Sequence, residues 1–232
     1  LADKAGLLAY VHRDYPRAET LYADALRHWR TVDDRSRQAT ILKQLCKVAL
    51  ERDDLERAST LADEALTLAR EVNDLYLIGA MLAHQGYIAH AQGDEQRATA
   101  LLEESLATHR QTGDTWGIAL GLMAVGFLAL AQGEPRRAAR HYAESLPALR
   151  DLGDISRIAE ALWGVGCSLA DGEDPRGAAR LLGTAQAIRE ALGRSIDPDD
   201  QVVEQRAVSL LRAHLGEAGL TDAVLAGRAL AP

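Results

Sequence analysis

The stretch that decides the fold runs from Met81 to Leu120 and reads MLAHQGYIAHAQGDEQRATALLEESLATHRQTGDTWGIAL. It holds two segments of helix length, separated by Gly93-Asp94 and followed by a second break at Gly113-Asp114. Glycine and aspartate between such segments are typical of a helix end followed by a new helix start. The next forty residues, Gly121 to Glu160, follow the same plan, and AHAQGDEQRA aligns with ALAQGEPRRA without a gap. These matches indicate an internal repeat.

Four columns of residues recur with the forty-residue period. An alanine occurs at Ala18, Ala58, Ala98, Ala138 and Ala178. An acid stands four positions earlier, at Asp14, Asp54, Asp94, Glu134 and Asp174. A small residue stands twelve positions earlier than the alanine, at Gly6, Cys46, Gly86, Gly126 and Gly166. Eight positions after the alanine come Leu26, Leu66, Leu106 and Leu146, with Gln186 in the fifth copy.

The residue types in these columns explain why each unit forms two helices. A small residue on the first helix and an alanine on the second let the two backbones approach closely. The acid caps the second helix by accepting hydrogen bonds from its free amide groups, and Pro135 and Pro175 occupy its first turn. The sequence therefore predicts an all-α fold of five helical hairpins, with approximate limits 1–38, 39–78, 79–118, 119–158 and 159–193.

The columns resemble the signature of the tetratricopeptide repeat (TPR), in which a small residue on helix A, an alanine on helix B and a later small residue recur. Here these residues are Gly86, Ala98 and Ser105, and one period later Gly126, Ala138 and Ser145. The period of forty exceeds the thirty-four usual for TPRs, so each helix is expected to carry about one extra turn. The resemblance implies a right-handed α–α superhelix (TPR solenoid) that binds other proteins.

The repeat pattern stops after Ile188, and residues 194–232 are expected to form C-terminal capping helices. Asp197-Pro198 predicts a helix start, the apolar residues from Val203 to Leu215 share one face, and Thr221 is expected to cap a last short helix. A terminal element of this kind covers the apolar end of a repeat stack.

The tail also resembles the end of the TPR region in LuxR-type and maltose-regulator-like signal-transduction ATPases (STAND regulators). The matching residues are Leu181, Leu182, Gly183, Arg189, Leu192, Gly193, Leu215, Gly216, Gly227, Arg228 and Leu230. Regulators of this kind carry a nucleotide-binding module upstream and in some cases a DNA-binding helix-turn-helix. The resemblance implies that this chain is a fragment of a larger bacterial signalling or transcription-regulatory ATPase.

Composition and charge argue against several functions. The net charge is −8 and the only lysines are Lys4, Lys43 and Lys47, whereas nucleic-acid binding needs clustered Lys and Arg. No apolar run approaches the ~20 residues of a membrane span and no signal-like segment occurs, so we expect a cytoplasmic protein. Cys46 and Cys167 lie three repeats apart, which predicts free thiols in a reducing compartment.

The sequence contains no catalytic constellation. It lacks the phosphate-binding GxxxxGK[ST] motif, and GxSxG, HExxH and CxxC do not occur. His84 and His90 lie six residues apart, on different faces of one helix, which is a poor arrangement for a metal. We therefore predict no enzyme activity, no cofactor and no metal site.

The candidate binding surface is the concave face, which helix A lines in a TPR superhelix. The groove positions of the family predict a surface containing Lys43, Lys47, Tyr87, His90, Met123, Phe127, Leu130 and Trp163. A surface that changes from basic to apolar and aromatic suits a protein or peptide segment, or neighbouring domains of the same chain. Carboxylate-clamp TPRs also need groove asparagines, and the single asparagine, Asn73, lies in a break, so that subclass is not expected.

Three alternatives stay open. The groove residues can pack against one another or under the C-terminal helices, which would leave no open groove. The same apolar surface can accept a small-molecule inducer, as in sensor domains of the maltose-regulator type. The chain can also form a homo-oligomer through an uncapped end of the repeat stack.

Overall fold

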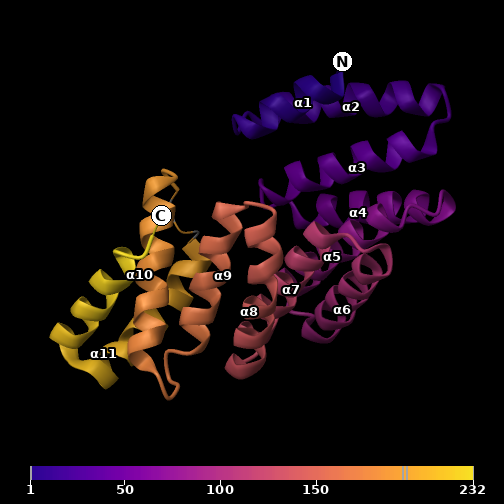
Figure 1. The fold of residues 1–232 in the computed structure, drawn as a ribbon. Coiled ribbons are helices and arrows are strands. Elements are labelled where there is room, and N and C mark those ends of the chain that lie inside the picture. Colours follow the sequence, from indigo (N-terminus) through magenta and orange to yellow (C-terminus); the bar gives the residue numbers. More distant parts are fainter. Residues whose placement is uncertain (1, 195, 197, 232) are drawn as a thin grey trace. The chain divides into compact units, whose positions relative to one another are not determined.

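The computed structural model describes residues 2–194, 196 and 198–231 (Figure 1). Within these residues the chain is all-α, as predicted, with eleven helices packed in consecutive pairs and no strand. The helices are α1 (Ala2–Val11), α2 (Tyr15–Thr31), α3 (Arg35–Leu50), α4 (Leu55–Glu71), α5 (Leu75–Ala91), α6 (Glu95–Thr112), α7 (Thr115–Ala131), α8 (Pro135–Asp151), α9 (Ile155–Ser168), α10 (Pro175–Ala191) and α11 (Pro198–Arg228). The chain divides into two compact units, Leu1–Gly117 and Ile118–Pro232.

At most of the breaks, a single aspartate closes the end of one helix with its backbone N–H and caps the start of the next helix with its carboxylate. At Asp94 the backbone N–H donates to the carbonyl of Ala89 (2.9 Å), which closes the end of α5. The carboxylate of the same residue accepts from the backbone N–H of Arg97 (3.1 Å), which caps α6. The residue just before, Gly93, has the left-handed backbone (φ 79°) that this ending requires.

The left-handed residue recurs every twenty residues, half the sequence repeat. It is found at Arg13, Asp33, Asp53, Asn73, Gly93, Gly113, Gly133 and Gly153, and again at Gly193. The break before α10 is the exception, because Glu173 does not have a positive φ. At these positions, breaks within a hairpin and breaks between hairpins therefore share one backbone conformation. The two kinds of break alternate along the chain, so the sequence itself repeats only every forty residues.

Two predicted helix caps are wrong. Glu134 precedes α8 but its side chain makes no capping hydrogen bond, and it pairs instead with Arg137 (2.9 Å), because the longer glutamate is a poorer cap than aspartate. Thr221 does not begin the last helix: the helical backbone is interrupted earlier, at Gly216 (φ 69°, ψ 171°), and the Thr221 hydroxyl donates to the carbonyl of Glu217 inside the helix (2.9 Å). The predicted cap Asp197 lies outside the described residues.

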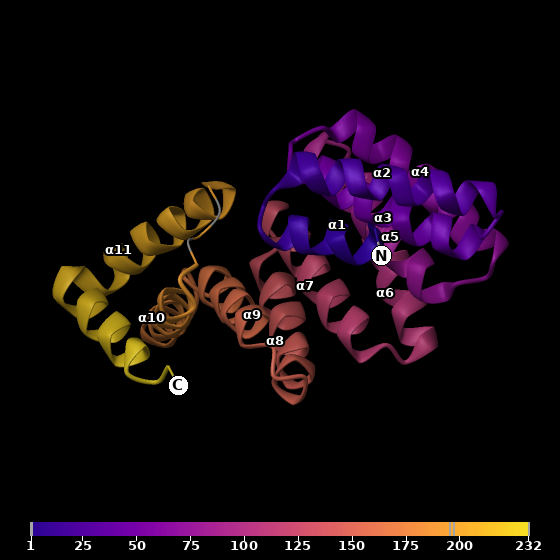
Figure 2. The ribbon, with the colours of Figure 1, turned by 90° about the horizontal axis from the view of Figure 1, so that it is seen from above.

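In the first unit each helix from α1 to α6 packs on the next, and α3 also packs on α5 (Figures 1 and 2). Small residues permit this close packing: Ala18, Ala58 and Ala98 are fully buried. A Cβ added to Gly86 of α5 would lie 2.7 Å from the side chain of Leu102 in α6, so a larger residue there would require Leu102 to shift. The same Cβ would lie 3.5 Å from the carbonyl oxygen of Ala98, so the small-residue and alanine columns meet where α5 and α6 approach closely.

In the second unit α11 covers α9 and α10. Its residues Ala207, Leu211, Leu220 and Ala223 share a buried cluster with Trp163, which belongs to α9. The interruption at Gly216 turns the last part of α11 back along α10 (Figure 2). The closest approach is between backbones, because a Cβ on Gly227 would lie 2.0 Å from the carbonyl oxygen of Arg180.

Polar contacts fix this terminal packing. The hydroxyl of Thr184 donates to the carbonyl of Gly227 (2.8 Å), and Arg228 donates to both carboxylate oxygens of Glu190 (3.0 and 2.5 Å). Arg189 forms an ion pair with Glu204 of α11 (3.0 Å). Several tail residues noted in the sequence thus hold α11 on α10.

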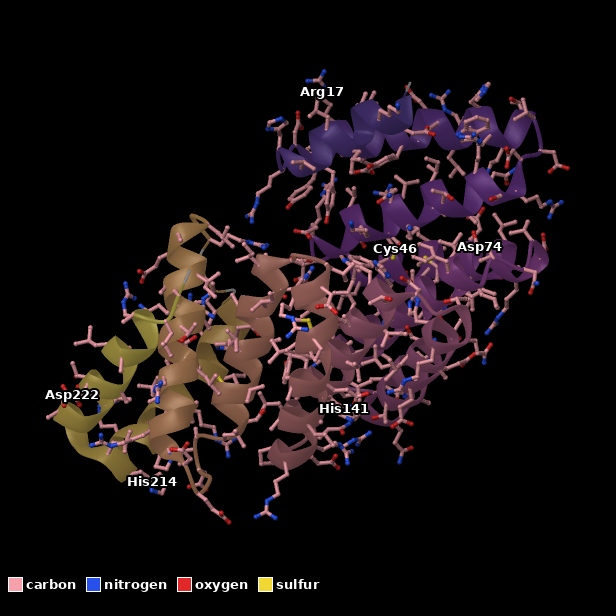
Figure 3. All side chains as sticks on the ribbon, viewed as in Figure 1. Arg17, Cys46, Asp74, His141, His214 and Asp222 are labelled. Atoms are coloured by element: carbon pink, nitrogen blue, oxygen red, sulfur yellow. The ribbon has the colours of Figure 1, made fainter. Side chains whose placement is uncertain are left out.

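Cys46 and Cys167 are both buried free thiols, and Figure 3 labels Cys46 inside the first unit. Burial raises the pKa of Cys46 to about 12, so its reactive thiolate form is suppressed at neutral pH. In the described part of the chain, no helix has the length and apolar character needed to cross a membrane.

Candidate functional site

Five side chains from three helices come together in the first unit, and we call them the lysine–tyrosine cluster: Tyr10, Lys43, Lys47, Tyr76 and His84. Tyr10 comes from α1, the two lysines from α3, and Tyr76 and His84 from α5. These are the first helices of three successive hairpins, the helices that the sequence assigns to the binding surface.

Each lysine of the cluster faces a tyrosine on a different helix. The ammonium nitrogen of Lys47 lies 4.6 Å from the ring centroid of Tyr10, and that of Lys43 lies 5.3 Å from the ring centroid of Tyr76. Both distances are within the range of a cation–π contact. Because Lys43 and Lys47 are one helical turn apart, their charges emerge on the same face of α3.

The Tyr10 ring is held in place by a carboxylate. Its hydroxyl donates to Oε1 of Glu51 (3.0 Å), and the hydroxyl of Tyr15 donates to Oε2 of the same residue (2.8 Å). Burial, followed by the charge of Glu51, raises the pKa of Tyr10, so its hydroxyl stays protonated and donating. Glu51 therefore positions the ring that faces Lys47.

The centre of the cluster carries concentrated positive charge. Burial, together with the charge of Lys47, lowers the pKa of Lys43, and Asp74 acts in the opposite direction. Burial and the two lysine charges lower the pKa of His84 to about 4, against a hydrogen bond between its Nδ1 and the carbonyl of Ala80 (2.6 Å). Lys43 has no ion pair with any carboxylate in the described residues, and an anion beside it would relieve the repulsion between the two lysines.

Four of the groove residues expected from the sequence lie in the first unit. Lys43 and Lys47 belong to the lysine–tyrosine cluster and are half-buried. Tyr87 is 42% exposed. His90 is half-buried, with Nδ1 2.8 Å from Oε1 of Glu95. The structure therefore joins the two lysines to tyrosines that the sequence prediction left out.

The other four expected groove residues lie in the second unit and are mostly packed. Met123 is 8% exposed and Trp163 is 4% exposed, while Phe127 and Leu130 are half-buried. Met123, Phe127 and Leu130 share one apolar cluster, and Leu130 also packs in the cluster of Trp163 and α11. Trp163 and Met123 are thus core side chains of the second unit.

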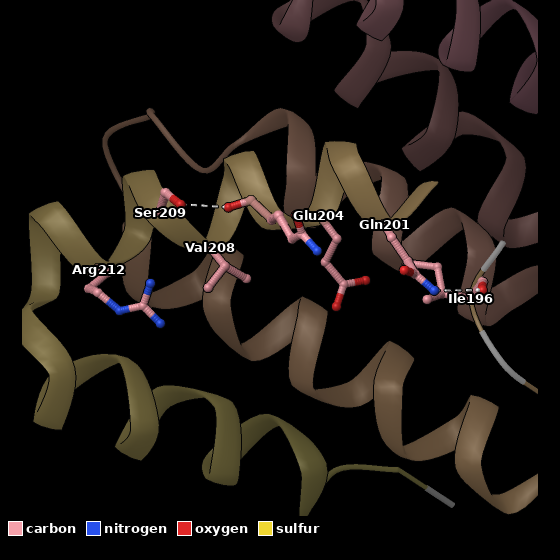
Figure 4. A pocket seen from close by; sticks show the side chains of 7 residues that line it. Ile196, Gln201, Glu204, Val208, Ser209 and Arg212 are labelled. Carbon is pink, nitrogen blue, oxygen red and sulfur yellow. Dashed lines mark hydrogen bonds between the residues drawn. The ribbon is translucent and has the colours of Figure 1, made fainter. Parts of the chain in front are cut away.

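A separate pocket lies along the first half of α11 (Figure 4). Its volume is about 480 Å³ and it is lined by Ile196, Gln201, Glu204, Gln205, Val208, Ser209 and Arg212. Several of its polar groups already have partners: Glu204 pairs with Arg189, and the hydroxyl of Ser209 donates to the carbonyl of Gln205 (2.7 Å). We assign no ligand to it. Among the side chains described, no three His, Cys, Asp or Glu residues gather as a metal site would require.

No protein-family model and no curated protein matches the sequence. Solved structures do match. The crystal structure of BtubC from P. vanneervenii superposes with a TM-score of 0.68 at 20% identity, over 92% of this chain and 87% of that one. A Rap protein complexed with Competence and Sporulation Factor gives a TM-score of 0.68 at 14% identity, over 98% of this chain and 71% of that one.

A third solved structure is a signal-transduction ATPase with numerous domains (STAND) with a tetratricopeptide repeat sensor, from Pyrococcus horikoshii. It matches with a TM-score of 0.57 at 15% identity over 97% of this chain, which spans 44% of that protein's length. At these identities the likeness concerns the fold. Together with the repeated, consecutively packed helix pairs, it shows that this chain has a TPR-like helical-repeat fold.

Proposed function

We propose that this chain is a non-catalytic interaction domain that binds a protein segment at the lysine–tyrosine cluster. The observation that carries the proposal is that two lysines of one hairpin face tyrosine rings of the two neighbouring hairpins. Lys43 faces Tyr76, and Lys47 faces Tyr10. Arg35 and Arg37 of α3 are in ion pairs, whereas Lys43 makes none in the described residues. A site where two lysine charges lie one helical turn apart, in a chain of net charge −8, favours a ligand that carries negative charge.

The chemistry of the cluster defines the segment. A carboxylate of the segment would bind to Lys43 and Lys47, and an apolar or aromatic side chain next to it would pack on the exposed ring of Tyr76. The similar Rap structure is a complex with Competence and Sporulation Factor, which supports a binding role for this fold without identifying a ligand here.

We also propose that the chain is the sensor part of a larger STAND-type regulator in the cytoplasm. The support is the tail motif and the likeness to a STAND protein with a tetratricopeptide repeat sensor. In that setting the bound segment belongs to a partner protein or to a neighbouring domain. The experiment below tests the binding site and is independent of this larger architecture.

The test uses pairs of synthetic peptides that are identical except that one has glutamate where the other has glutamine. Fluorescence anisotropy is measured with the wild type, with Lys43→Ala/Lys47→Ala, and with Lys4→Ala as the matched control, since Lys4 is exposed on α1 outside the cluster. The glutamate peptides should bind the wild type and the Lys4 variant, and bind the double variant roughly tenfold or more weakly. Equal binding of glutamate and glutamine peptides to the wild type would refute the proposed site.

A further inference from the structure

The two lysines of the lysine–tyrosine cluster hold their positive charges unequally. The ammonium nitrogen of Lys47 lies 4.6 Å from the ring centroid of Tyr10, whereas that of Lys43 lies 5.3 Å from the ring centroid of Tyr76. Because cation–π attraction weakens with distance, the ring contact favours the charged form of Lys47 more than that of Lys43. Lys43 is also half-buried and makes no ion pair in the described residues. Of the two amines, Lys43 therefore gives up its proton more readily.

The titratable groups that act on Lys43 come from two helices and the break between hairpins. Burial, followed by the charge of Lys47 on the same helix, lowers the pKa of Lys43, and Asp74 before α5 acts in the opposite direction. Two groups of α5 add no charge at neutral pH, because burial raises the pKa of Tyr76 and lowers the pKa of His84 to about 4. The neutral amine, which is the nucleophilic form, is therefore more abundant at Lys43 than at an ordinary lysine.

We propose that Lys43 is an acylation site whose donors are small acyl phosphates. An acyl phosphate carries its reactive carbonyl carbon next to a doubly charged phosphate group. Lys47, one helical turn from Lys43, would bind the phosphate through a charge-assisted hydrogen bond, which places the carbonyl carbon beside the Lys43 amine. An uncharged acyl donor lacks the group that Lys47 binds and would not be oriented in this way.

The reaction transfers an acyl group from oxygen to nitrogen. The lone pair of the neutral Lys43 amine attacks the carbonyl carbon and forms the C–N bond. The bond between the carbonyl carbon and the phosphate oxygen breaks, and its electron pair leaves with the phosphate. The nitrogen loses one proton, which the departing phosphate takes up, so the products are an amide and hydrogen phosphate. The amide is uncharged, so one of the two positive charges on this face of α3 is lost.

The experiment uses the lysines of the chain as their own comparison. Lys4, Lys43 and Lys47 are the only three, and Lys4 is exposed on α1 outside the cluster. The wild type is incubated with acetyl phosphate near neutral pH, and acetylation of each lysine is followed over time by peptide mass spectrometry. Lys43 should react about fivefold or more faster than Lys4. Exposure alone predicts the opposite order, and a rate at Lys43 equal to or below that at Lys4 would overturn the inference.

Two variants and two additions test the role of Lys47. Lys47→Arg keeps the positive charge and should keep the fast reaction at Lys43, whereas Lys47→Gln should lower that rate to about the rate at Lys4. Inorganic phosphate should slow acetylation of Lys43 and leave that of Lys4 unchanged. An uncharged donor, the N-hydroxysuccinimide ester of acetic acid, should discriminate less between the two lysines. Equal discrimination by both donors would show that phosphate is not recognised, and the assignment of acyl phosphates would be wrong.

Acetylation of Lys43 should also weaken the binding of an acidic segment, a consequence that rests on the proposed function, whereas the acylation itself does not. Chain acetylated at Lys43 should bind the glutamate peptides severalfold more weakly than unmodified chain in fluorescence anisotropy. Unchanged peptide binding would count against the proposed binding site. The relative rates at Lys43 and Lys4 decide separately whether the acylation site exists.

Discussion

The imidazole of His109 occupies the space that a side chain on Gly79 would need. A Cβ added to Gly79 would lie 2.7 Å from Nε2 of His109, and one added to Gly117 would lie 2.2 Å from Nδ1. The ring is 5% exposed, and its Nδ1 is 3.0 Å from Oδ2 of Asp114. α6 thus places the large polar side chain of His109 against Gly79 of α5 and Gly117 of α7, which have no side chains.

We predict that Gly79→Ala destabilises the first unit because the added methyl group displaces His109. Overpacking of this kind costs about 1–3 kcal/mol in the free energy of unfolding, which a urea denaturation series measures. In the double variant Gly79→Ala/His109→Ala, the obstacle is removed, so the two losses should not add. Additive losses would show that His109 is not what excludes a side chain at Gly79.

His84 should make stability depend on pH. Its folded-state pKa of about 4 is below the ordinary value near 6.5, so the unfolded chain takes up a proton first as the pH falls. Stability is therefore fully present above about pH 6.5 and is lost as the pH falls toward about 4, by roughly 1–3 kcal/mol. In His84→Gln this part of the loss should disappear from urea unfolding curves. His12→Gln, which removes an exposed histidine of the first unit, should keep the wild-type profile.

Two ion pairs of the second unit should differ in strength. Arg189 and Glu204 are 14% and 26% exposed, and their pairing holds α11 on α10, whereas Arg212 and Glu217 are 50% and 73% exposed. Glu204→Gln should cost about 1–3 kcal/mol in unfolding free energy, because it leaves a largely buried guanidinium without its partner. The control Glu217→Gln should cost less than about 0.5 kcal/mol. Equal losses would contradict the assigned role of the Arg189–Glu204 pair.

Gly227→Ala should loosen the end of α11. The new Cβ would meet the backbone carbonyl of Arg180 at 2.0 Å, and backbone cannot move aside as a flexible side chain can. We expect faster amide hydrogen exchange after Gly216 and a lower melting temperature. Gly219→Ala is the control in the same helix, because its Cβ would touch only Leu215 at 3.4 Å, and it should be neutral or stabilising by up to about 1 kcal/mol.

The hairpin architecture was predictable because it depends on short-range sequence relationships. Gly86 and Leu102 contact each other within one repeat, and Asp94 caps the helix that begins beside it. The two wrong helix caps were predicted from residue type alone, without the length of the side chain or the course of the backbone before it. Glu134 stands in an aspartate column but has a longer side chain, and Gly216 interrupts α11 before Thr221 is reached.

The candidate site was less predictable because it depends on contacts between helices. The i,i+4 spacing of Lys43 and Lys47 placed both on one face of α3. That Tyr76 faces Lys43, and Tyr10 faces Lys47, depends on how α1 and α5 pack beside α3, which no spacing in the sequence encodes. The expected groove residue Trp163 is buried in a cluster with residues of α11. Because α11 lies after the repeats, the repeated columns could not predict that it covers Trp163.

The left-handed residue found every twenty positions has a consequence for how such a chain can change length in evolution. Adding or losing one helix with its break would leave every connection in its usual conformation, yet it would interchange the first and second helices from that point onward. Lys43 and Lys47 would then move from a first helix to a second helix. A duplication of forty codons would preserve both the connections and the alternation of first and second helices, so a chain of this kind can lengthen in that step without exchanging the two helix types.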